Sequence, residues 1–153
     1  MITKPKKLPI QPPFFYGWIV VLFASMAVFF SGPGQTYSIS IFTDAYLSHF
    51  GWSSTLISTM YLFATLLAGF LLFIIGRLVD KYGQRKMIVI TATLLGIACV
   101  FNSFLLGPTM LFIGFFMLRL FGQGSLTLIP STIIPQWFVI KRGRALSIMA
   151  FGS

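Results

Sequence analysis

The chain has 153 residues, of which 57% are hydrophobic and only 8% are charged, and its formal net charge is +9. A soluble domain usually carries about 25% charged residues, so this chain cannot cover a water-facing surface and we expect an integral membrane protein. The positive charge does not indicate nucleic acid binding, because the basic residues fall in short clusters at the ends of apolar runs.

Long apolar runs divide the chain, and a transmembrane helix needs roughly 20 mostly apolar residues. We therefore predict an all-α membrane protein in which a cytoplasmic tail, residues 1–13, precedes four transmembrane helices and the start of a fifth. The predicted helices lie at about 14–47, 54–75, 87–106, 110–137 and, truncated, 145–153. The last is too short to span a membrane, so we expect the chain to be a fragment of a longer protein.

The first predicted helix is retained rather than cleaved. Its apolar stretch is longer than the roughly 7–15 residues of a signal-peptide core, and further spans follow it. The sequence Gly32-Pro33-Gly34 interrupts this helix. Because proline and glycine weaken a helix, the apolar run either ends there or resumes toward Leu47.

The basic residues give the predicted orientation. They form groups at Lys4, Lys6 and Lys7, at Arg77, Lys81, Arg85 and Lys86, and at Lys141, Arg142 and Arg144, with a lone Arg119. The groups alternate with joints that lack Lys and Arg, and cytoplasmic loops collect basic residues. We therefore expect an integral protein of a bacterial plasma membrane, with its N-terminus and both basic joints in the cytoplasm.

The joint at residues 76–86, GRLVDKYGQRK, combines glycines with one acid among bases. Its first glycine leaves room for a neighbouring backbone, and Gly83 can adopt the left-handed conformation that ends a helix. Asp80 can pair with Arg77 or Lys81, or cap a neighbouring helix. From these residues alone, two interpretations stay open: a tight turn fixed by charge, or an ordinary cytoplasmic loop.

This joint resembles the signature loop of the major facilitator superfamily, G-x-L-x-D-[RK]-x-G-x-[RK]-[RK]. The matching glycines and charged residues are Gly76, Asp80, Lys81, Gly83, Arg85 and Lys86. Residues 119–124, RLFGQG, are similar to the second motif of that family, an intramembrane arginine followed by glycines. Trp137-Phe138 and residues 142–145, RGRA, resemble the turn after the fourth helix in the branch that contains oxalate/formate exchangers and monocarboxylate transporters.

The resemblance implies secondary active transport of a small solute by alternating access through a central cavity. The family fold has twelve helices in two halves, and the signature loop helps to latch the halves together without touching substrate. The partners implied are membrane lipid, the solute, an ion if transport is coupled, and the C-terminal transporter helices that this chain does not contain. We do not expect these residues to transport anything alone.

Arg119 is the most informative single residue. It lies nine residues after Met110, so at about 1.5 Å per residue it is roughly 13 Å deep in a core about 30 Å thick. A charge at that depth costs at least about 2.5 kcal/mol and usually faces a cavity or a partner. Three interpretations stay open: an anion-binding residue, a structural or proton-linked pair with polar groups on the first helix, or a charge tolerated by local water and lipid defects.

The candidate cavity residues are Arg119 and Gln123 on the fourth predicted helix and Gln35 and Tyr37 on the first. Both helices contain glycine or proline interruptions, and interrupted helices at corresponding positions indicate a transport site; the alternative is that these residues only bend the helices for packing. An unpaired cation in a cavity favours an organic anion as solute, or a counter-charge in the transporter half that this chain lacks. The first helix lacks the lysine common in proton-coupled monocarboxylate transporters.

Enzymatic functions find no support in the sequence. No His/Cys/Asp cluster has metal-ligand spacing, no glycine-rich loop is suited to phosphate, and no nucleophile–base set is visible, so we expect neither catalysis nor a cofactor. We interpret His49 as an ordinary interfacial histidine and Cys99 as an apolar side chain. The alternative function is a small autonomous four-helix membrane protein that acts as an oligomer or as a non-transporting membrane partner.

Overall fold

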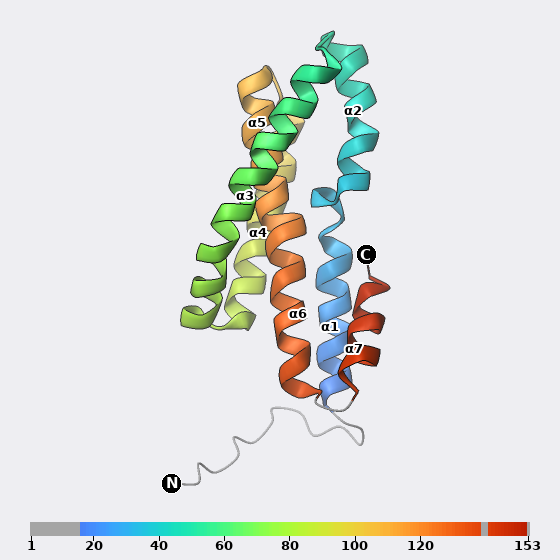
Figure 1. Cartoon of the computed structure of the whole chain (residues 1–153), viewed down its shortest axis with the longest axis vertical. Coiled ribbons are helices and arrows are strands. Elements are labelled where there is room, and N and C mark those ends of the chain that lie inside the picture. The colour runs from blue at the N-terminus through green and yellow to red at the C-terminus, as the bar shows by residue number, and fades with distance from the viewer. Residues whose placement is uncertain (1–15, 139–140, 153) are drawn as a thin grey trace.

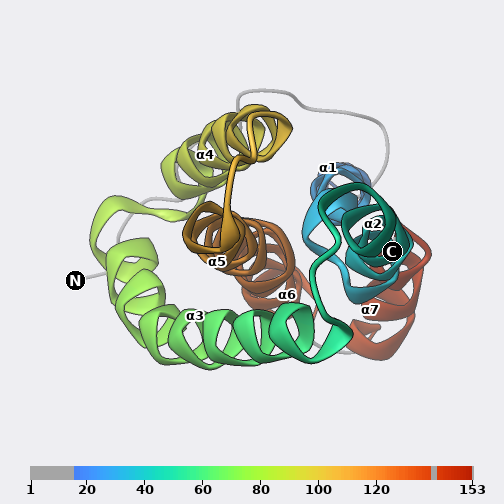
Figure 2. The same cartoon turned by 90° about the horizontal axis from the view of Figure 1, so that it is seen from above.

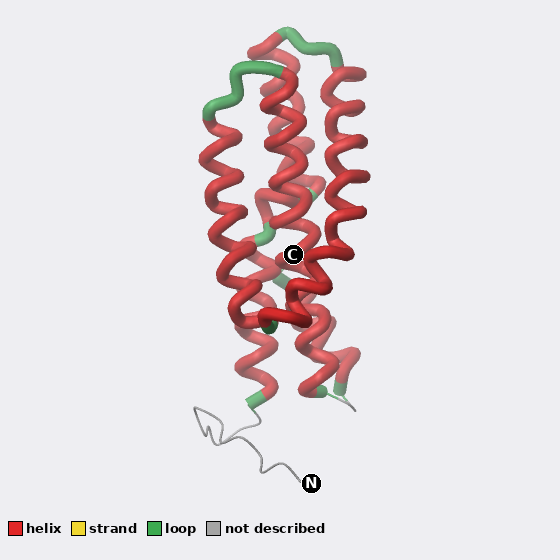
Figure 3. The backbone as a smooth tube through the Cα atoms, turned by 90° about the vertical axis from the view of Figure 1, so that its left-hand side faces the viewer, coloured by secondary structure: helices red, strands yellow, loops and turns green. Residues whose placement is uncertain are grey.

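The computed structural model describes residues 16–138 and 141–152, so the predicted tail at 1–13 and the start of the first predicted helix lie outside the described residues. Within the described part all regular structure is helical, and the longer helices run side by side along one axis (Figure 1, Figure 3). The prediction of an all-α membrane fold is confirmed.

The elements follow the apolar runs of the sequence. In chain order they are α1 (Gly17–Phe30), the short 3-10 helix η1 (Gly32–Gly34), α2 (Thr36–Phe50), α3 (Ser54–Tyr82), α4 (Gln84–Ser103), α5 (Pro108–Met117), the π-helix η2 (Leu118–Ser125), α6 (Leu126–Trp137) and α7 (Arg142–Ala150). Together α5, η2 and α6 form one continuous helix of 30 residues. This helix, α3 and α4 are long and apolar enough to cross a membrane, and α1 is a shorter apolar helix of 14 residues.

The first predicted helix, at about 14–47, is divided by a break. Figure 1 shows α1 and α2 stacked end to end, with η1 between them. Pro33 lies in the first turn of η1, and Gln35 is extended, with φ −75° and ψ 152°, before α2 begins. Because proline has no backbone N–H, the chain cannot carry an unbroken helical ladder through this point. The helix resumes and continues to Phe50.

The predicted second helix, 54–75, is too short, because α3 continues to Tyr82. At its start the Ser53 hydroxyl accepts a hydrogen bond from a backbone N–H of the first turn at 3.2 Å, as an N-cap does. In its last turns the Arg77 guanidinium carbon lies 4.3 Å from the centre of the Phe73 ring. This contact lets a charged residue continue the helix at the membrane face.

The turn between α3 and α4 is a single residue, Gly83, with φ +85°. Glycine adopts this backbone conformation without the steric cost that a Cβ would bring. The predicted third helix at 87–106 is therefore displaced, and α4 covers Gln84–Ser103. Similarly α7 begins at Arg142, ahead of the predicted start of 145–153.

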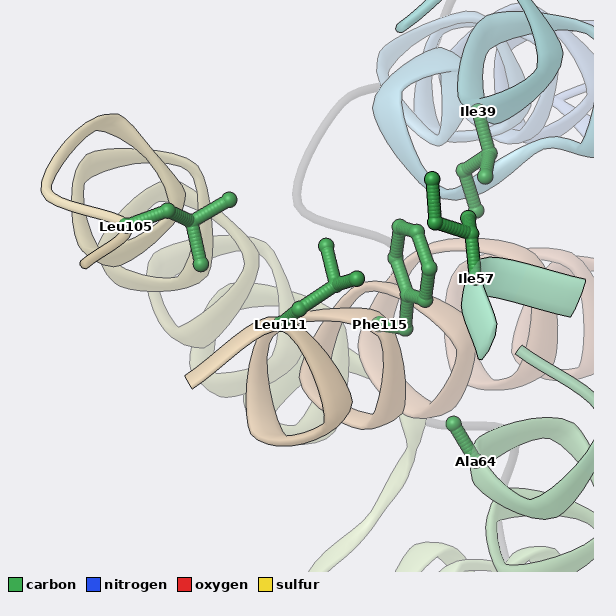
Figure 4. Packing of buried hydrophobic residues seen from close by; sticks show 6 residues of the cluster. All are labelled: Ile39, Ile57, Ala64, Leu105, Leu111 and Phe115. Carbon is green, nitrogen blue, oxygen red and sulfur yellow. The ribbon is translucent and has the colours of Figure 1, made fainter. Parts of the chain in front are cut away.

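The α5–η2–α6 helix lies in the middle of the bundle. Seen from above in Figure 2, α4 lies above it, α3 below it and α1 to its right. One buried cluster joins α2, α3, α5 and the turn before α5, and its members are Ile39, Ile57, Ala64, Leu105, Leu111 and Phe115. Figure 4 shows the Phe115 ring pointing toward Ile57 and Ile39. In a bilayer, such clusters act through close packing, since lipid is as apolar as they are.

The two interrupted helices touch at their interruptions. The Gly34 backbone of η1 packs against the backbone of η2, so that a Cβ at Gly34 would lie 2.7 Å from the Gly122 Cα and the Gln123 N. A Cβ at Gly122 would in turn lie 2.7 Å from the Gly34 Cα. Only glycine at both positions permits this approach, as at the small-residue contacts of transmembrane helices. The contact fixes the start of α2 beside η2.

Substitution of alanine for Gly34 tests this contact. We expect Gly34→Ala to lower the free energy of unfolding by about 1–3 kcal/mol, the usual cost of overpacking, because the opposing atoms are backbone. The measurement is denaturant unfolding of the purified protein in mixed micelles, followed by circular dichroism. Gly96→Ala is the matched control, because a Cβ at Gly96 meets nothing within 4 Å. Equal stability of the two variants would contradict the close contact.

Candidate functional site

Arg119 lies near the middle of the longest helix. It is eleven residues after Pro108, where α5 begins, so at about 1.5 Å per residue it is about 17 Å along the axis. A hydrocarbon core is about 30 Å thick, which places the guanidinium far from both membrane faces. A cation at this depth requires polar surroundings supplied by the protein or by water.

The helix around Arg119 is locally a π-helix, η2. The Ser125 hydroxyl donates to the Leu120 carbonyl at 2.7 Å, five residues earlier. A π segment widens the helix by inserting a residue into a turn, and such segments are frequent at functional sites. Two glycines of η2, Gly122 and Gly124, lie against η1 and α3 respectively. The sequence signal for this segment was the run of residues 119–124, in which small residues follow the arginine.

The guanidinium of Arg119 is held by neutral groups from two other helices. Its Nη1 donates a hydrogen bond to the Thr36 hydroxyl of α2 at 3.2 Å. Its central carbon lies 5.1 Å from the centre of the Tyr61 ring of α3, within the range of a cation–π interaction. The Thr36 and Tyr61 hydroxyls are 3.3 Å apart. These three residues form a connected group that joins α2, α3 and η2.

No carboxylate among the described residues forms an ion pair with Arg119. The Thr36 hydroxyl and the Tyr61 ring satisfy part of its hydrogen bonding and electrostatics, but neither carries a negative charge. The interpretation in which Arg119 pairs with a polar group of the first apolar run therefore has a candidate partner, the neutral Thr36 hydroxyl. A cation with neutral partners in a low-dielectric region still attracts an anion strongly.

Two hollows meet at this group. The α3/η2 hollow, of about 210 Å³, is lined by Arg119, Gln123 and Thr65 with apolar Ala68 and Leu72. The α2/α3 hollow, of about 140 Å³, is lined by apolar Ile39, Ile57 and Phe115 and by the hydroxyl-bearing residues Thr36, Ser40, Thr43, Ser58 and Tyr61. Arg119 therefore lines the first hollow itself, and its partners Thr36 and Tyr61 line the second. A larger hollow of about 390 Å³ lies between α1, α4 and α6 near Arg85 and does not involve Arg119.

The four residues predicted to line a cavity divide into two pairs. Arg119 and Gln123 share the α3/η2 hollow. Gln35 does not line either hollow beside Arg119, because its side-chain nitrogen donates to the Ser31 hydroxyl at 2.9 Å. Tyr37 is exposed and lines neither hollow. The break in the first apolar run instead presents Thr36, the residue between them, to the arginine.

Two site residues on α3 were missing from the predicted set, Tyr61 and Thr65. With Ser58 they place polar groups at positions 58, 61 and 65 of α3. Spacings of three and four residues put side chains on one helical face. The sequence therefore predicts that these three side chains lie on the same face of α3. This polar stripe predicts that one face of α3 meets polar partners.

The residues of the signature motif lie at one end of the bundle, far from the hollows around Arg119. Most of this segment is helical, so the expectation of a loop is wrong except at Gly83. Among residues 16–138 and 141–152, Asp80 forms no ion pair with Arg77 or Lys81, and no side chain caps α4. The Lys81 ammonium lies 5.4 Å from the centre of the Tyr82 ring instead. Asp80 is exposed and free to meet another surface.

Loss of the Thr36 hydroxyl should weaken the connection between α2 and η2. We expect Thr36→Val, which keeps the shape of the side chain, to lower the free energy of unfolding by about 1.5 kcal/mol, because a charged donor loses its acceptor. Denaturant unfolding in mixed micelles measures the change. Thr93→Val is the matched control, since the Thr93 hydroxyl bonds only to the Val89 carbonyl of its own helix. Identical losses in both variants would contradict a specific role for the Thr36–Arg119 bond.

Comparison with known proteins agrees with these features. The family model described as Major Facilitator Superfamily matches residues 18–153. The match covers the helix break, the signature motif and the arginine of η2. No curated protein and no solved structure matches the chain.

Proposed function

Because the chain belongs to the major facilitator superfamily, a family of transmembrane transporters, we propose that it binds small organic anions for secondary active transport. The observation that carries this proposal is Arg119, a cation near the middle of a transmembrane helix with neutral partners only. Arg119 lines the α3/η2 hollow, and its partners Thr36 and Tyr61 line the α2/α3 hollow. A carboxylate bound there would neutralise the one described arginine or lysine that lies away from the basic end of the bundle.

The geometry suggests how an anion would be held. The Nη1 group of Arg119 donates a hydrogen bond to the Thr36 hydroxyl. The planar guanidinium has further N–H donors for a carboxylate. An arginine–carboxylate pair with parallel hydrogen bonds is strong and directional in a low dielectric. Its contacts with Thr36 and Tyr61 hold the side chain in place, so little conformational entropy is lost when the anion binds. The proposed solute is therefore small and singly charged.

The signature segment takes a separate role in this proposal. Gly76, Asp80, Lys81, Gly83, Arg85 and Lys86 lie at the lower end of Figure 1, as does the turn between α6 and α7. We assign this basic end to the cytoplasm, because cytoplasmic joints collect lysine and arginine. The exposed Asp80 is available there to contact further transporter helices and to control alternating access, with no part in binding solute.

A second function has one observation in its favour. The Thr36–Arg119 bond joins two elements that are far apart in the sequence, so the arginine could serve packing alone in a small non-transporting membrane protein. A structural arginine would contribute to stability and leave anion binding unaffected. The two functions therefore predict different results for one substitution.

Replacement of the charge at Arg119 separates the two functions. The purified chain in lipid nanodiscs is titrated with short-chain carboxylates, with and without a hydroxyl group, and with the matching neutral amides, and binding is followed by ligand-observed NMR. We expect at least one carboxylate to bind, and Arg119→Gln to weaken that binding by at least about tenfold, because a hydrogen bond to a charged group contributes about 1.5–3 kcal/mol.

The control for this experiment is Arg77→Gln, which removes the same charge at the membrane face beside Phe73. We expect this variant to bind carboxylates as the unmodified chain does. Carboxylate binding that survives Arg119→Gln unchanged, with lower stability of that variant, would contradict anion binding at Arg119 and favour the structural function.

A further inference from the structure

The hollow between α1, α4 and α6 lies at the basic end of the bundle, away from Arg119. Its volume is about 390 Å³. Figure 2 shows α1 and α4 standing apart, and the hollow lies between them against α6. This volume is within the roughly 300–1,000 Å³ of pockets that hold drug-sized ligands, whereas the hollow beside Arg119, of about 210 Å³, is smaller. The space is therefore sufficient for a substantial part of a bound molecule.

The polar residues of this hollow lie at one level. Gln84 and Arg85 begin α4, Tyr16 precedes α1 and Trp137 ends α6. These three helix ends lie toward the lower end of Figure 1. The Tyr16 and Trp137 rings are 5.5 Å apart, and such residues are enriched where a membrane meets water. All four side chains can donate hydrogen bonds, so the mouth of the hollow suits an acceptor-rich group at the level of the lipid headgroups.

Toward the membrane interior the hollow is apolar. Its walls there are formed by Ile19, Val20, Phe23 and Ala24 of α1, Ile88 of α4 and Ile133 of α6. Phe23 comes seven residues after Tyr16, so at about 1.5 Å per residue the apolar wall extends about 10 Å from the mouth. A soluble anion gains nothing from such a wall, whereas a hydrocarbon chain packs against it. The occupant is therefore expected to be amphipathic.

Charge complementarity determines the polar part of the occupant. Arg85 lines the mouth, and no acidic residue lines the hollow. Among residues 16–138 and 141–152, the Arg85 side chain forms no hydrogen bond or ion pair. A further apolar helix in the hollow would cover the walls but would leave this guanidinium without a counter-charge. An anionic group joined to a hydrocarbon chain satisfies both parts.

We propose that the hollow between α1, α4 and α6 binds an anionic phospholipid, with its phosphate at Arg85 and Gln84 and one acyl chain along the apolar wall. The polar mouth and the apolar interior match the orientation of a lipid in its leaflet. Basic pockets between transmembrane helices on the cytoplasmic side bind anionic headgroups in other membrane proteins. The site is separate from Arg119, so it does not depend on the proposed transport of organic anions. A bound lipid would join α1 to α4.

Fluorescence quenching at Trp137 tests this site. Trp18→Phe and Trp52→Phe leave Trp137 as the reporter, because the chain has three tryptophans. The protein is placed in phosphatidylcholine vesicles with a small share of phosphatidylglycerol or phosphatidylcholine that carries brominated acyl chains, which quench tryptophan on contact. We expect half-maximal quenching at an at least about fivefold lower share of phosphatidylglycerol, because a basic residue at the membrane face attracts anionic lipid. Arg85→Gln should reduce this preference to less than about twofold.

The matched control is Lys86→Gln, which removes the same charge one residue along, outside the hollow. This variant should keep a preference of at least about threefold. Equal losses in the Arg85 and Lys86 variants would overturn the site, because attraction to the basic surface would then explain the result. Glycerol phosphate, which has no acyl chain, should not relieve the quenching, and relief would overturn a lipid as occupant. Absence of quenching by either lipid would also overturn it and would favour a second copy of the chain or another helix in the hollow.

Discussion

The backbone contact between Gly34 and Gly122 is the constraint on which the site depends. It joins the break in the first apolar run to the π segment of the longest helix, at a separation that a Cβ on either residue would not allow. As a result the first residue of α2, Thr36, lies beside Arg119, and α3 completes the group with Tyr61. The breaks in both helices thus do more than bend them, because they bring polar groups together at mid-membrane depth.

The distribution of charge follows from the cost of placing ions in lipid. Apart from Arg119, the described lysines and arginines lie in or next to helix ends at one end of the bundle, where their side chains are exposed. Arg77 and Lys81 lie over aromatic rings there, which lets α3 extend beyond its apolar core. Arg119 lies away from that end, and its charge is placed beside the Thr36 hydroxyl, the Tyr61 ring and the α3/η2 hollow. Its charge is the clearest functional feature of the described chain.

Much of the fold was predictable, because apolar length and charge determine transmembrane helices. The all-α fold, the break at Gly32-Pro33-Gly34 and the place of Arg119 inside a long apolar helix all followed from the sequence. The ends of the helices did not, since a helix such as α3 continues past the apolar run when its charged side chains find aromatic partners. The surroundings of Arg119 were only half predictable. Gln123 follows Arg119 by four residues on the same helix and lines the same hollow. Whether Gln35, Thr36 or Tyr37 reaches Arg119 depends on the rotation of α2 after η1. That rotation is set by tertiary packing, which no local pattern encodes.

The most direct measurement is the accessibility of position 119 to water. In a Cys99→Ala background, which removes the chain's own cysteine, Arg119→Cys and Phe70→Cys are treated with a charged methanethiosulfonate reagent in nanodiscs. Phe70 of α3 is 79% exposed. Its neighbour Gly69 lines the α3/η2 hollow together with Arg119. Phe70 therefore serves as an outward-facing control at a depth similar to that of Arg119. The account predicts rapid modification at 119 and slow modification at 70. Equal, slow modification at both positions would contradict a polar hollow beside Arg119.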